Sequence, residues 1–330
     1  MEKILLTGCA GFIGYHLSKK LLNQGYEVIG IDNINDYYDV SLKKARLDLI
    51  PRERFSYIQE DISNKSKLIQ VFDEYSPSVV VNLAAQAGVR YSIENPDTYI
   101  KSNIQGFHNV LEACRLFKPK HLLFASSSSV YGMNESIPFS EGDRTDFPVS
   151  LYAATKKSNE TMAFTYSHLF GIPISGLRFF TVYGPFGRPD MAYFKFTKAI
   201  FDEEPIEVYN EIHMKRDFTY IDDIVEGIAK LVEKSPRMKK HISTQAEAAF
   251  EIFNIGNNSP VSLHEFIATL ENLIGKKANK IKLGMQPGDV LETFADVNLL
   301  SSKVGYQPKT NIKEGLTHFV KWYREYYKFN

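Results

Sequence analysis

The stretch Thr7-Gly8-Cys9-Ala10-Gly11-Phe12-Ile13-Gly14 joins an apolar run at Ile4–Thr7 to an amphipathic stretch at Phe12–Gln24. This order predicts a strand, a glycine-rich turn and a helix. Such a turn lets a pyrophosphate approach the backbone N–H groups at the helix N-terminus. The stretch lacks the Lys-Ser/Thr ending of a nucleotide-hydrolysing phosphate loop. The residues predicted to bind a dinucleotide here are Gly8, Gly11, Phe12, Ile13 and Gly14.

A carboxylate stands where such a site needs one. Asp32 follows Gly14 by eighteen residues, at the end of the apolar run Glu27–Ile31. In this position it can accept hydrogen bonds from the hydroxyls of an adenosine ribose. A 2′-phosphate would meet its negative charge, and the next residue is Asn33 rather than an arginine. The pattern therefore favours NAD over NADP, the alternative being a structural glycine loop followed by a solvated turn aspartate.

Short apolar runs alternate with longer amphipathic stretches through the first half of the chain. The expected strands are Ile4–Thr7, Glu27–Ile31, Ser78–Leu83, Leu122–Ser126 and Ile174–Phe179, and the expected helices are Phe12–Gln24, Asn64–Tyr75, Thr98–Lys118 and Leu151–Phe170. Runs that are apolar throughout belong in a parallel sheet covered on both faces. The predicted fold class is α/β, with a Rossmann-type doubly wound parallel sheet.

After Phe179 the alternation stops, and prolines and short elements follow. A strand at Ile252–Ile255 and helices at Leu263–Ile274 and Ile312–Tyr327 are expected there. The length of 330 residues allows two interlocked domains. We expect a dinucleotide-binding domain at 1–178, with returning segments near 218–258, and a smaller, interleaved α/β substrate-binding domain at 179–330.

The amino-acid composition indicates which kinds of partner this chain is expected to lack. Lys plus Arg and Asp plus Glu both total 39, so no net charge attracts nucleic acid or an anionic membrane. No apolar run approaches the roughly 20 residues of a membrane span. Cys9 and Cys114 are too few for a disulfide framework, and His108 and His121 lack the spacing of metal ligands. We expect a cytoplasmic protein with no metal and no nucleic-acid or membrane partner.

Several strings resemble a known family over essentially the whole chain. The glycine turn with Thr7, Asn82-Leu83-Ala84-Ala85, Ser126–Ser129 followed by Val130-Tyr131-Gly132, and Tyr152-Ala153-Ala154-Thr155-Lys156 resemble the extended short-chain dehydrogenases/reductases. Longer and more specific strings, at residues 35–40, 86–92, 183–191 and 215–220, are similar to the UDP-glucuronate 4-epimerases within that family.

The resemblance implies that Tyr152, Lys156 and Ser127 catalyse the reaction. A free tyrosine has a pKa of about 10 and becomes a base at neutral pH only when a nearby cation favours the phenolate. Lys156 and the positive nicotinamide would supply that cation. On a helix, residues four apart share one face. Alone, such a Tyr–Lys pair is more often a surface feature, but this one follows a serine run at the end of a parallel strand, where sites form.

The implied reaction starts with proton removal from a C4 hydroxyl by Tyr152 and hydride transfer to NAD⁺. The 4-keto sugar then rotates and takes the hydride back on its other face, so UDP-glucuronate becomes UDP-galacturonate and NAD is regenerated. By the same resemblance, further cofactor contacts come from Asn33, Asp61, Ile62, Leu83, Ala84, Ala85 and Asn103, and also from the catalytic Tyr152 and Lys156.

The resemblance also implies the contacts to a UDP-hexuronic acid. Arg216 matches a diphosphate contact, and Tyr209 and Asp289 match uracil- and ribose-binding positions. Relatives that act on neutral UDP-hexoses commonly carry an arginine where this chain has Gln286. The alternative for Arg216 is a surface salt bridge.

For the sugar, Arg188, Thr181, Ser128 and Ser129 resemble the residues that bind the C5 carboxylate, and Arg90 the lining of the sugar pocket. UDP-glucuronate decarboxylases and hexose 4,6-dehydratases carry an acidic residue in the segment matching Ser128 and Ser129. Two hydroxyls there favour epimerisation over elimination or decarboxylation. The alternative for Arg188 is a structural arginine in a turn.

Other readings remain open. The chain could instead epimerise UDP-glucose, UDP-N-acetylglucosamine or its uronic acid, or be an NAD-bound regulatory protein without catalysis. The resemblance further implies a homodimer. Helices Thr98–Lys118 and Leu151–Phe170 carry apolar residues on more than one side, which indicates either a subunit contact or a thick helical layer over the sheet; these residues are Phe107, Val110, Leu111, Phe164, Tyr166 and Leu169.

Overall fold

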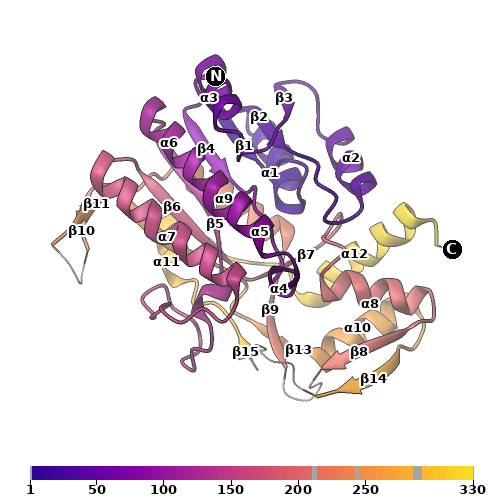
Figure 1. Cartoon of the computed structure of the whole chain (residues 1–330). Coiled ribbons are helices and arrows are strands. Elements are labelled where there is room, and N and C mark those ends of the chain that lie inside the picture. The colour runs from indigo at the N-terminus through magenta and orange to yellow at the C-terminus, as the bar shows by residue number, and fades with distance from the viewer. Residues whose placement is uncertain (1, 210–213, 242–244, 285–291, 330) are drawn as a thin grey trace.

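The computed structural model describes residues 2–209, 214–241, 245–284 and 292–329. Its centre is a parallel sheet of seven described strands in the order β12-β6-β5-β4-β1-β2-β3 (Figure 1). The strands are β1 (Lys3–Thr7), β2 (Glu27–Asp32), β3 (Phe55–Gln59), β4 (Val79–Asn82), β5 (His121–Ser127), β6 (Ile174–Phe179) and β12 (Phe250–Ile255). The strand order reverses between β1 and β4, where open α/β sheets form ligand crevices. The predicted Rossmann-type α/β class is confirmed.

Helices cover both faces of this sheet, as Figure 1 shows. One layer contains α3 (Lys65–Tyr75), α6 (Phe107–Phe117) and α7 (Leu151–Phe170), and the other contains α1 (Phe12–Asn23), α9 (Ile221–Val232) and α11 (Asn298–Val304). Phe107, Val110 and Leu111 are buried between α6 and the sheet. These three residues therefore belong to the helical layer and not to a subunit contact.

The predicted helix Thr98–Lys118 is interrupted. The chain forms α5 (Pro96–Tyr99), a π-helical segment η1 (Ile100–Gly106) and then α6. Two features accompany the wider turn: Gly106 lies so close to Ile62 that an added Cβ would be 2.7 Å from Ile62 Cγ1, and the Asn103 carbonyl accepts a hydrogen bond from the Asn159 side chain at 2.6 Å. Single π turns of this kind redirect side chains.

Several elements near this sheet were not predicted, α11 among them. Strand β3 lies at the sheet edge and is mostly half-exposed, so it lacks a continuous apolar run. Helix α2 (Val40–Asp48) has few apolar residues. Helix α9 has a strong apolar face against α1, but it follows the point where the alternation of elements ends.

Helix α9 and strand β12 return to the first half of the chain: α9 packs on α1, and β12 pairs in parallel with β6. They fall within the expected return near 218–258, although the division into domains stays a prediction. The predicted strand at 252–255 begins two residues earlier in the structure.

A second group of elements lies beyond the carboxyl ends of the sheet. Strands β7 (Thr181–Tyr183), β13 (Pro260–Ser262) and β15 (Glu292–Thr293) pair around β9 (Lys215–Tyr220), and β8 (Pro205–Tyr209) pairs with β14 (Asn279–Leu283). The helices are α8 (Ala192–Phe201), α10 (Leu263–Ile274) and α12 (Ile312–Tyr327), the last two as predicted. The buried Asp217 accepts backbone hydrogen bonds from Asn257, Asn258 and Ala295, which joins these segments.

None of the helices in the described ranges has both the length and the apolar character needed to cross a bilayer.

Candidate active site

A cleft of about 1160 Å³ lies between the carboxyl ends of the sheet and the elements around β8 and β9. Its lining begins at the glycine turn, passes the ends of β2, β4 and β5, and reaches Tyr209 and Arg216. The cleft thus lies where strand order reverses, the usual position of ligands in open α/β sheets.

The glycine turn leaves no room for side chains. Gly8 has φ +75°, and a Cβ there would lie 2.8 Å from Ala84 N, while a Cβ on Gly14 would lie 2.0 Å from Gly8 O. The Thr7 hydroxyl donates to Asn82 Oδ1 at 2.7 Å and accepts from Ala84 N at 3.1 Å. This close packing keeps the backbone bare beside the start of α1, as a bound pyrophosphate requires.

Asp32 lies at the far end of this turn. Its carboxylate accepts hydrogen bonds from Ala10 N at 3.1 Å and from Ile34 N at 2.9 Å. Burial raises its pKa, while these hydrogen bonds and the nearby Lys43 act in the opposite direction. Asn33 donates to Asp61 at 3.2 Å, so two of the predicted cofactor residues lie together. This end of the cleft fits the ribose of NAD.

The predicted cofactor residues come together, with one exception. The cleft lining contains Gly8, Gly11, Phe12, Ile13, Gly14, Asp32, Asn33, Asp61, Ile62, Leu83, Ala84, Ala85, Tyr152 and Lys156. Asn103 is buried behind it instead. Its side chain pairs with both backbone groups of Gln86, at 2.8 and 3.0 Å, and donates to Thr155 at 3.0 Å. Asn103 therefore braces a cleft residue, and the π-helical segment directs it there.

The three predicted catalytic residues lie at the junction of β5 and α7. Helix α7 begins after Ser150, whose hydroxyl caps it by accepting from Ala153 N at 3.1 Å. This start places Tyr152 and Lys156 on the face toward the cleft, with Lys156 Nζ 5.9 Å from the centre of the Tyr152 ring. Ser127 ends β5 and donates to Ser129 Oγ at 3.1 Å.

Burial shifts both titrating groups toward their neutral forms. It lowers the pKa of Lys156 to about 7, and the ammonium donates to the backbone carbonyl of Ala125 at 2.8 Å. Burial also raises the pKa of Tyr152, while hydrogen bonding to Ser127 and the charge of Arg188 act in the opposite direction. A base built from Tyr152 therefore depends on nearby cations.

A buried ion pair supports this junction. Glu160, one turn after Lys156, accepts from Ser126 Oγ at 2.6 Å and from Arg178 Nε at 2.8 Å, and the paired side chains are 5% and 4% exposed. This pair was not predicted from the sequence, because its residues lie on different elements and only the four-residue interval from Lys156 to Glu160 hinted at it.

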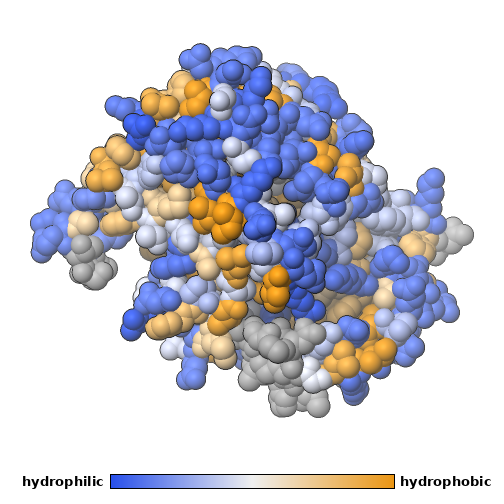
Figure 2. Space-filling model, viewed as in Figure 1, coloured by the Kyte–Doolittle hydropathy of each residue, from blue (hydrophilic) through white to orange (hydrophobic). Residues whose placement is uncertain are grey.

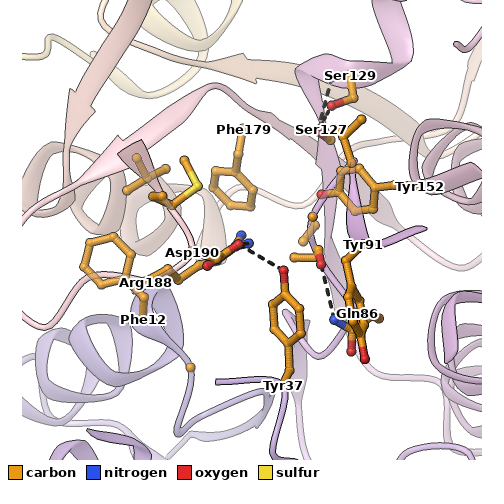
Figure 3. Close-up of a pocket in the computed structure, with 18 of the residues that line it drawn as sticks. Phe12, Tyr37, Gln86, Tyr91, Ser127, Ser129, Tyr152, Phe179, Arg188 and Asp190 are labelled. Atoms are coloured by element: carbon orange, nitrogen blue, oxygen red, sulfur yellow. Dashed lines mark hydrogen bonds and ion pairs between the residues drawn. The ribbon is translucent and has the colours of Figure 1, made fainter. Parts of the chain in front are cut away.

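The opposite wall carries Arg188, and Thr181, Ser128 and Ser129 also line the cleft. Figure 3 shows Arg188 and Asp190 across the cleft from Tyr152, with Tyr37 pointing at them. Asp190 and Tyr37 belong to the quoted strings, yet the sequence analysis assigned them no role. Pairing between residues 153 positions apart leaves no local signal.

The loop that carries Arg188 is tied to the cofactor turn by Arg46. This fully buried arginine on α2 donates to the carbonyls of Ala10, Phe186 and Gly187 at 2.7–3.0 Å, and to the Tyr38 hydroxyl at 2.6 Å. Arg46 therefore joins the glycine turn to the wall of the cleft that carries Arg188. Arg46 too was missed, because α2 was not predicted.

At the outer end of the cleft, Arg90 stacks over Tyr209 with its guanidinium carbon 5.3 Å from the ring centre. Arg216 also lines the cleft and donates to the Lys215 carbonyl at 2.9 Å. Asp289 and Gln286 lie outside the described residues. Cys9 and Cys114 are buried, and no cluster of His, Cys, Asp or Glu suited to a metal ion occurs in the described ranges.

A bare glycine turn before the first helix, and a Tyr–Lys pair beside a serine at the end of a parallel strand, are the features by which the extended short-chain dehydrogenases/reductases are recognised. Within this class, residues 5–319 match the sequence model of the GDP-mannose 4,6-dehydratase family, and the chain belongs to that family.

Similar proteins cover nearly the full chain. Protein CapI of Staphylococcus aureus is 58% identical over 99% of both chains. A probable UDP-glucuronate 4-epimerase of Rhizobium meliloti is 45% identical, covering 99% of this chain and 98% of its own. The structure of a UDP-glucuronic acid 4-epimerase from Bacillus cereus with UDP-glucuronic acid and NAD has a TM-score of 0.88 and 37% identity, over 98% of this chain and all of that one.

Proposed function

We propose that the chain is an NAD-dependent UDP-glucuronate 4-epimerase, an isomerase that forms UDP-galacturonate through a transient 4-keto sugar. One observation carries the proposal: Arg188 faces Tyr152 across the cleft, and the cleft-lining residues directly after β5 are Ser128 and Ser129 rather than a carboxylate. The names of the similar proteins support the same activity.

Tyr152 is the proposed base and acid. It removes the proton of the C4 hydroxyl and later returns it, with Ser127 orienting the hydroxyl and the cation of Lys156 favouring the phenolate. Bound NAD supplies a hydride acceptor that becomes the donor when the reaction reverses. Because C4 is oxidised and reduced within one turnover, no cofactor is consumed.

The proposed carboxylate site consists of Arg188, Thr181, Ser128 and Ser129. A guanidinium binds a carboxylate with charge-assisted hydrogen bonds, and hydroxyls add donors without adding an acid. A 4-keto uronate loses CO₂ readily, so a site that lacks a carboxylate at Ser128 and Ser129 favours return of the hydride. Arg216, Tyr209 and Asp289 are the proposed contacts to the UDP, and Arg90 lines the sugar pocket.

The test is to incubate the purified protein with UDP-glucuronate, without added NAD, and to follow the sugar protons by NMR. The expected product has an inverted C4 proton and an intact carboxylate. Parallel tubes contain UDP-glucose and UDP-N-acetylglucosamine. Turnover of these neutral sugars alone would favour an epimerase of UDP-glucose or UDP-N-acetylglucosamine. No turnover in any tube after NAD is added would favour a non-catalytic protein.

We further propose a cytoplasmic homodimer that pairs through α6 and α7. These neighbouring helices expose Leu116, Leu169 and Phe170, which are 52%, 62% and 46% accessible. Figure 2 shows groups of apolar side chains among hydrophilic ones on the face formed by these helices. Analytical ultracentrifugation should give a dimer for the wild type and a monomer for the double variant Leu169→Glu, Phe170→Glu; a wild-type monomer would reject the proposal.

A further inference from the structure

Tyr37 and Asp190 surround Arg188 on the wall opposite Tyr152 (Figure 3). Arg188 Nε donates to Asp190 Oδ1 at 3.0 Å, and a terminal amino group of Arg188 donates to Oδ2 at 2.5 Å. The Tyr37 hydroxyl donates to the same Oδ2 at 3.1 Å. One edge of the guanidinium is therefore already occupied by a carboxylate of the protein itself.

The pair remains open to the cleft. The side chains of Arg188 and Asp190 are 26% and 23% exposed, and both line the cleft together with Tyr37. A guanidinium has five N–H donors, of which Asp190 engages two, so the others can reach a ligand. The backbone of Arg188 is fixed independently, because its N–H donates to the Tyr193 hydroxyl at 2.9 Å.

Asp190 is ionised at neutral pH. Burial alone would raise its pKa, but Arg188 and the Tyr37 hydroxyl hold that pKa below its ordinary value. The two side chains together therefore carry no net charge. A ligand carboxylate meets N–H donors whose positive charge is largely offset by Asp190, and not a free cation.

A guanidinium whose positive charge is partly offset suits a sugar that must rotate within the site. Between the loss and the return of the hydride, the keto sugar rotates and its carboxylate rotates with it. In a partly desolvated cleft, a free cation would hold one orientation of the carboxylate strongly. Binding energy spent equally on ground state and transition state does not raise turnover, and excess ground-state affinity slows it.

We propose that Asp190, held by Tyr37, is a positioning residue that weakens the attraction of Arg188 for the substrate carboxylate, so that a hexuronate is selected yet released between its two orientations. The inference rests on the proposed function. It assigns to Asp190 a role in both specificity and turnover, although its charge is the same as that of the substrate group.

The test measures affinity without chemistry. NAD-loaded protein with Tyr152→Phe is titrated calorimetrically with UDP-glucuronate and with UDP-glucose, with and without Asp190→Asn. The amide keeps the shape and removes the charge. The Kd for UDP-glucuronate should fall about three- to tenfold, and that for UDP-glucose should change less than about twofold. In the enzyme with Tyr152 intact, Asp190→Asn should lower KM and kcat together.

Asp146→Asn is the matched control, because Asp146 pairs with Arg144 two positions earlier, at 2.9 Å, on an exposed loop. It should leave both affinities unchanged. An unchanged or weaker affinity for UDP-glucuronate in Asp190→Asn, or equal tightening for UDP-glucose, would overturn the inference.

Tyr37→Phe gives a second test of opposite sign, which also serves if Asp190→Asn does not fold. The ring keeps its contact with Tyr91, with 4.7 Å between ring centres. The Asp190 carboxylate, however, loses a hydrogen-bond donor, so its negative charge offsets the charge of Arg188 more strongly. The Kd for UDP-glucuronate should rise about twofold; tighter or unchanged binding would overturn the inference. Failure of the proposed function is seen separately, as absent turnover of UDP-glucuronate by the wild type.

Discussion

Ser127, Tyr152 and Lys156 line one wall of the cleft, and Tyr37, Arg188 and Asp190 line the other (Figure 3). On the first wall, Lys156 is 3% exposed and is held by a backbone carbonyl of β5. On the second, the side chains hold one another and stay about a quarter exposed.

The difference separates two tasks. Groups that exchange a proton with the substrate need a fixed position and a dry environment, since both determine their pKa. Groups that recognise a moving carboxylate need a charge that can be adjusted. Pairing between side chains makes the charge of such a site adjustable in evolution, because a substitution of one partner changes the charge without moving the backbone. Substitutions on the first wall should therefore affect rate, and those on the second should affect the choice of substrate.

The largest effect is expected for Tyr152→Phe. Without its hydroxyl no base or acid acts at C4, and turnover should fall roughly 10²- to 10⁴-fold. Calorimetry should still detect UDP-glucuronate binding, because the ring remains. Tyr26→Phe, which removes a surface hydroxyl bonded to Glu233 at 2.9 Å, is the control. Comparable losses in both variants would contradict the assignment.

Lys156→Met should lower turnover at neutral pH roughly 10²-fold. The lysine cation favours the Tyr152 phenolate, so its removal raises the tyrosine pKa and shifts the rising limb of the kcat–pH profile to higher pH. Burial already lowers the pKa of Lys156 to about 7, so in the wild type this cation is lost as pH rises through that value. A limb at the same pH in variant and wild type would remove Lys156 from this role.

On the opposite wall, Arg188→Ala should lower kcat/KM for UDP-glucuronate roughly 10- to 100-fold, because the carboxylate loses its cation and faces an unpaired Asp190. Activity on UDP-glucose, where measurable, should change little. Arg144→Ala removes an arginine from the equally spaced surface pair with Asp146 and serves as the control. Equal losses with both substrates would break the division between the walls.

A further effect concerns stability rather than activity, through a residue on neither wall. Burial lowers the pKa of His121 from 6.5 to about 4. The unfolded chain therefore binds the extra proton first, and stability present above about pH 6.5 is lost as pH falls toward 4, by at most roughly 3 kcal/mol. Urea unfolding should show a smaller acid loss for His121→Gln than for the wild type; parallel losses would refute the assignment.

Much of the first wall and of the cofactor turn could be predicted from the sequence, because the strings that carry the family resemblance there are short and local. The glycine turn is one short stretch, β4 and β5 are continuous apolar runs, and Tyr152 and Lys156 are one helical turn apart. The fold class followed from the same runs. The strand at the sheet edge and the polar α2 escaped because neither has a strong apolar period.

The second wall could be predicted only in part. Arg188, like Tyr152 and Lys156, was recognised through resemblance, but its pairing with Tyr37 depends on tertiary packing that brings distant loops together. Asn103 shows the opposite case: a residue assigned to the cofactor is directed into the interior by a π turn that no sequence period indicates.

Arg46 holds the loop before Arg188 through main-chain oxygens alone, at Phe186 and Gly187. Carbonyl groups are common to all residues, so this attachment survives most exchanges of the loop's side chains. The constraint falls instead on Gly187, where a Cβ would lie 2.2 Å from the Tyr193 hydroxyl. The side chains of this loop can therefore change in evolution, or be redesigned for another sugar, while Arg46 continues to hold its backbone.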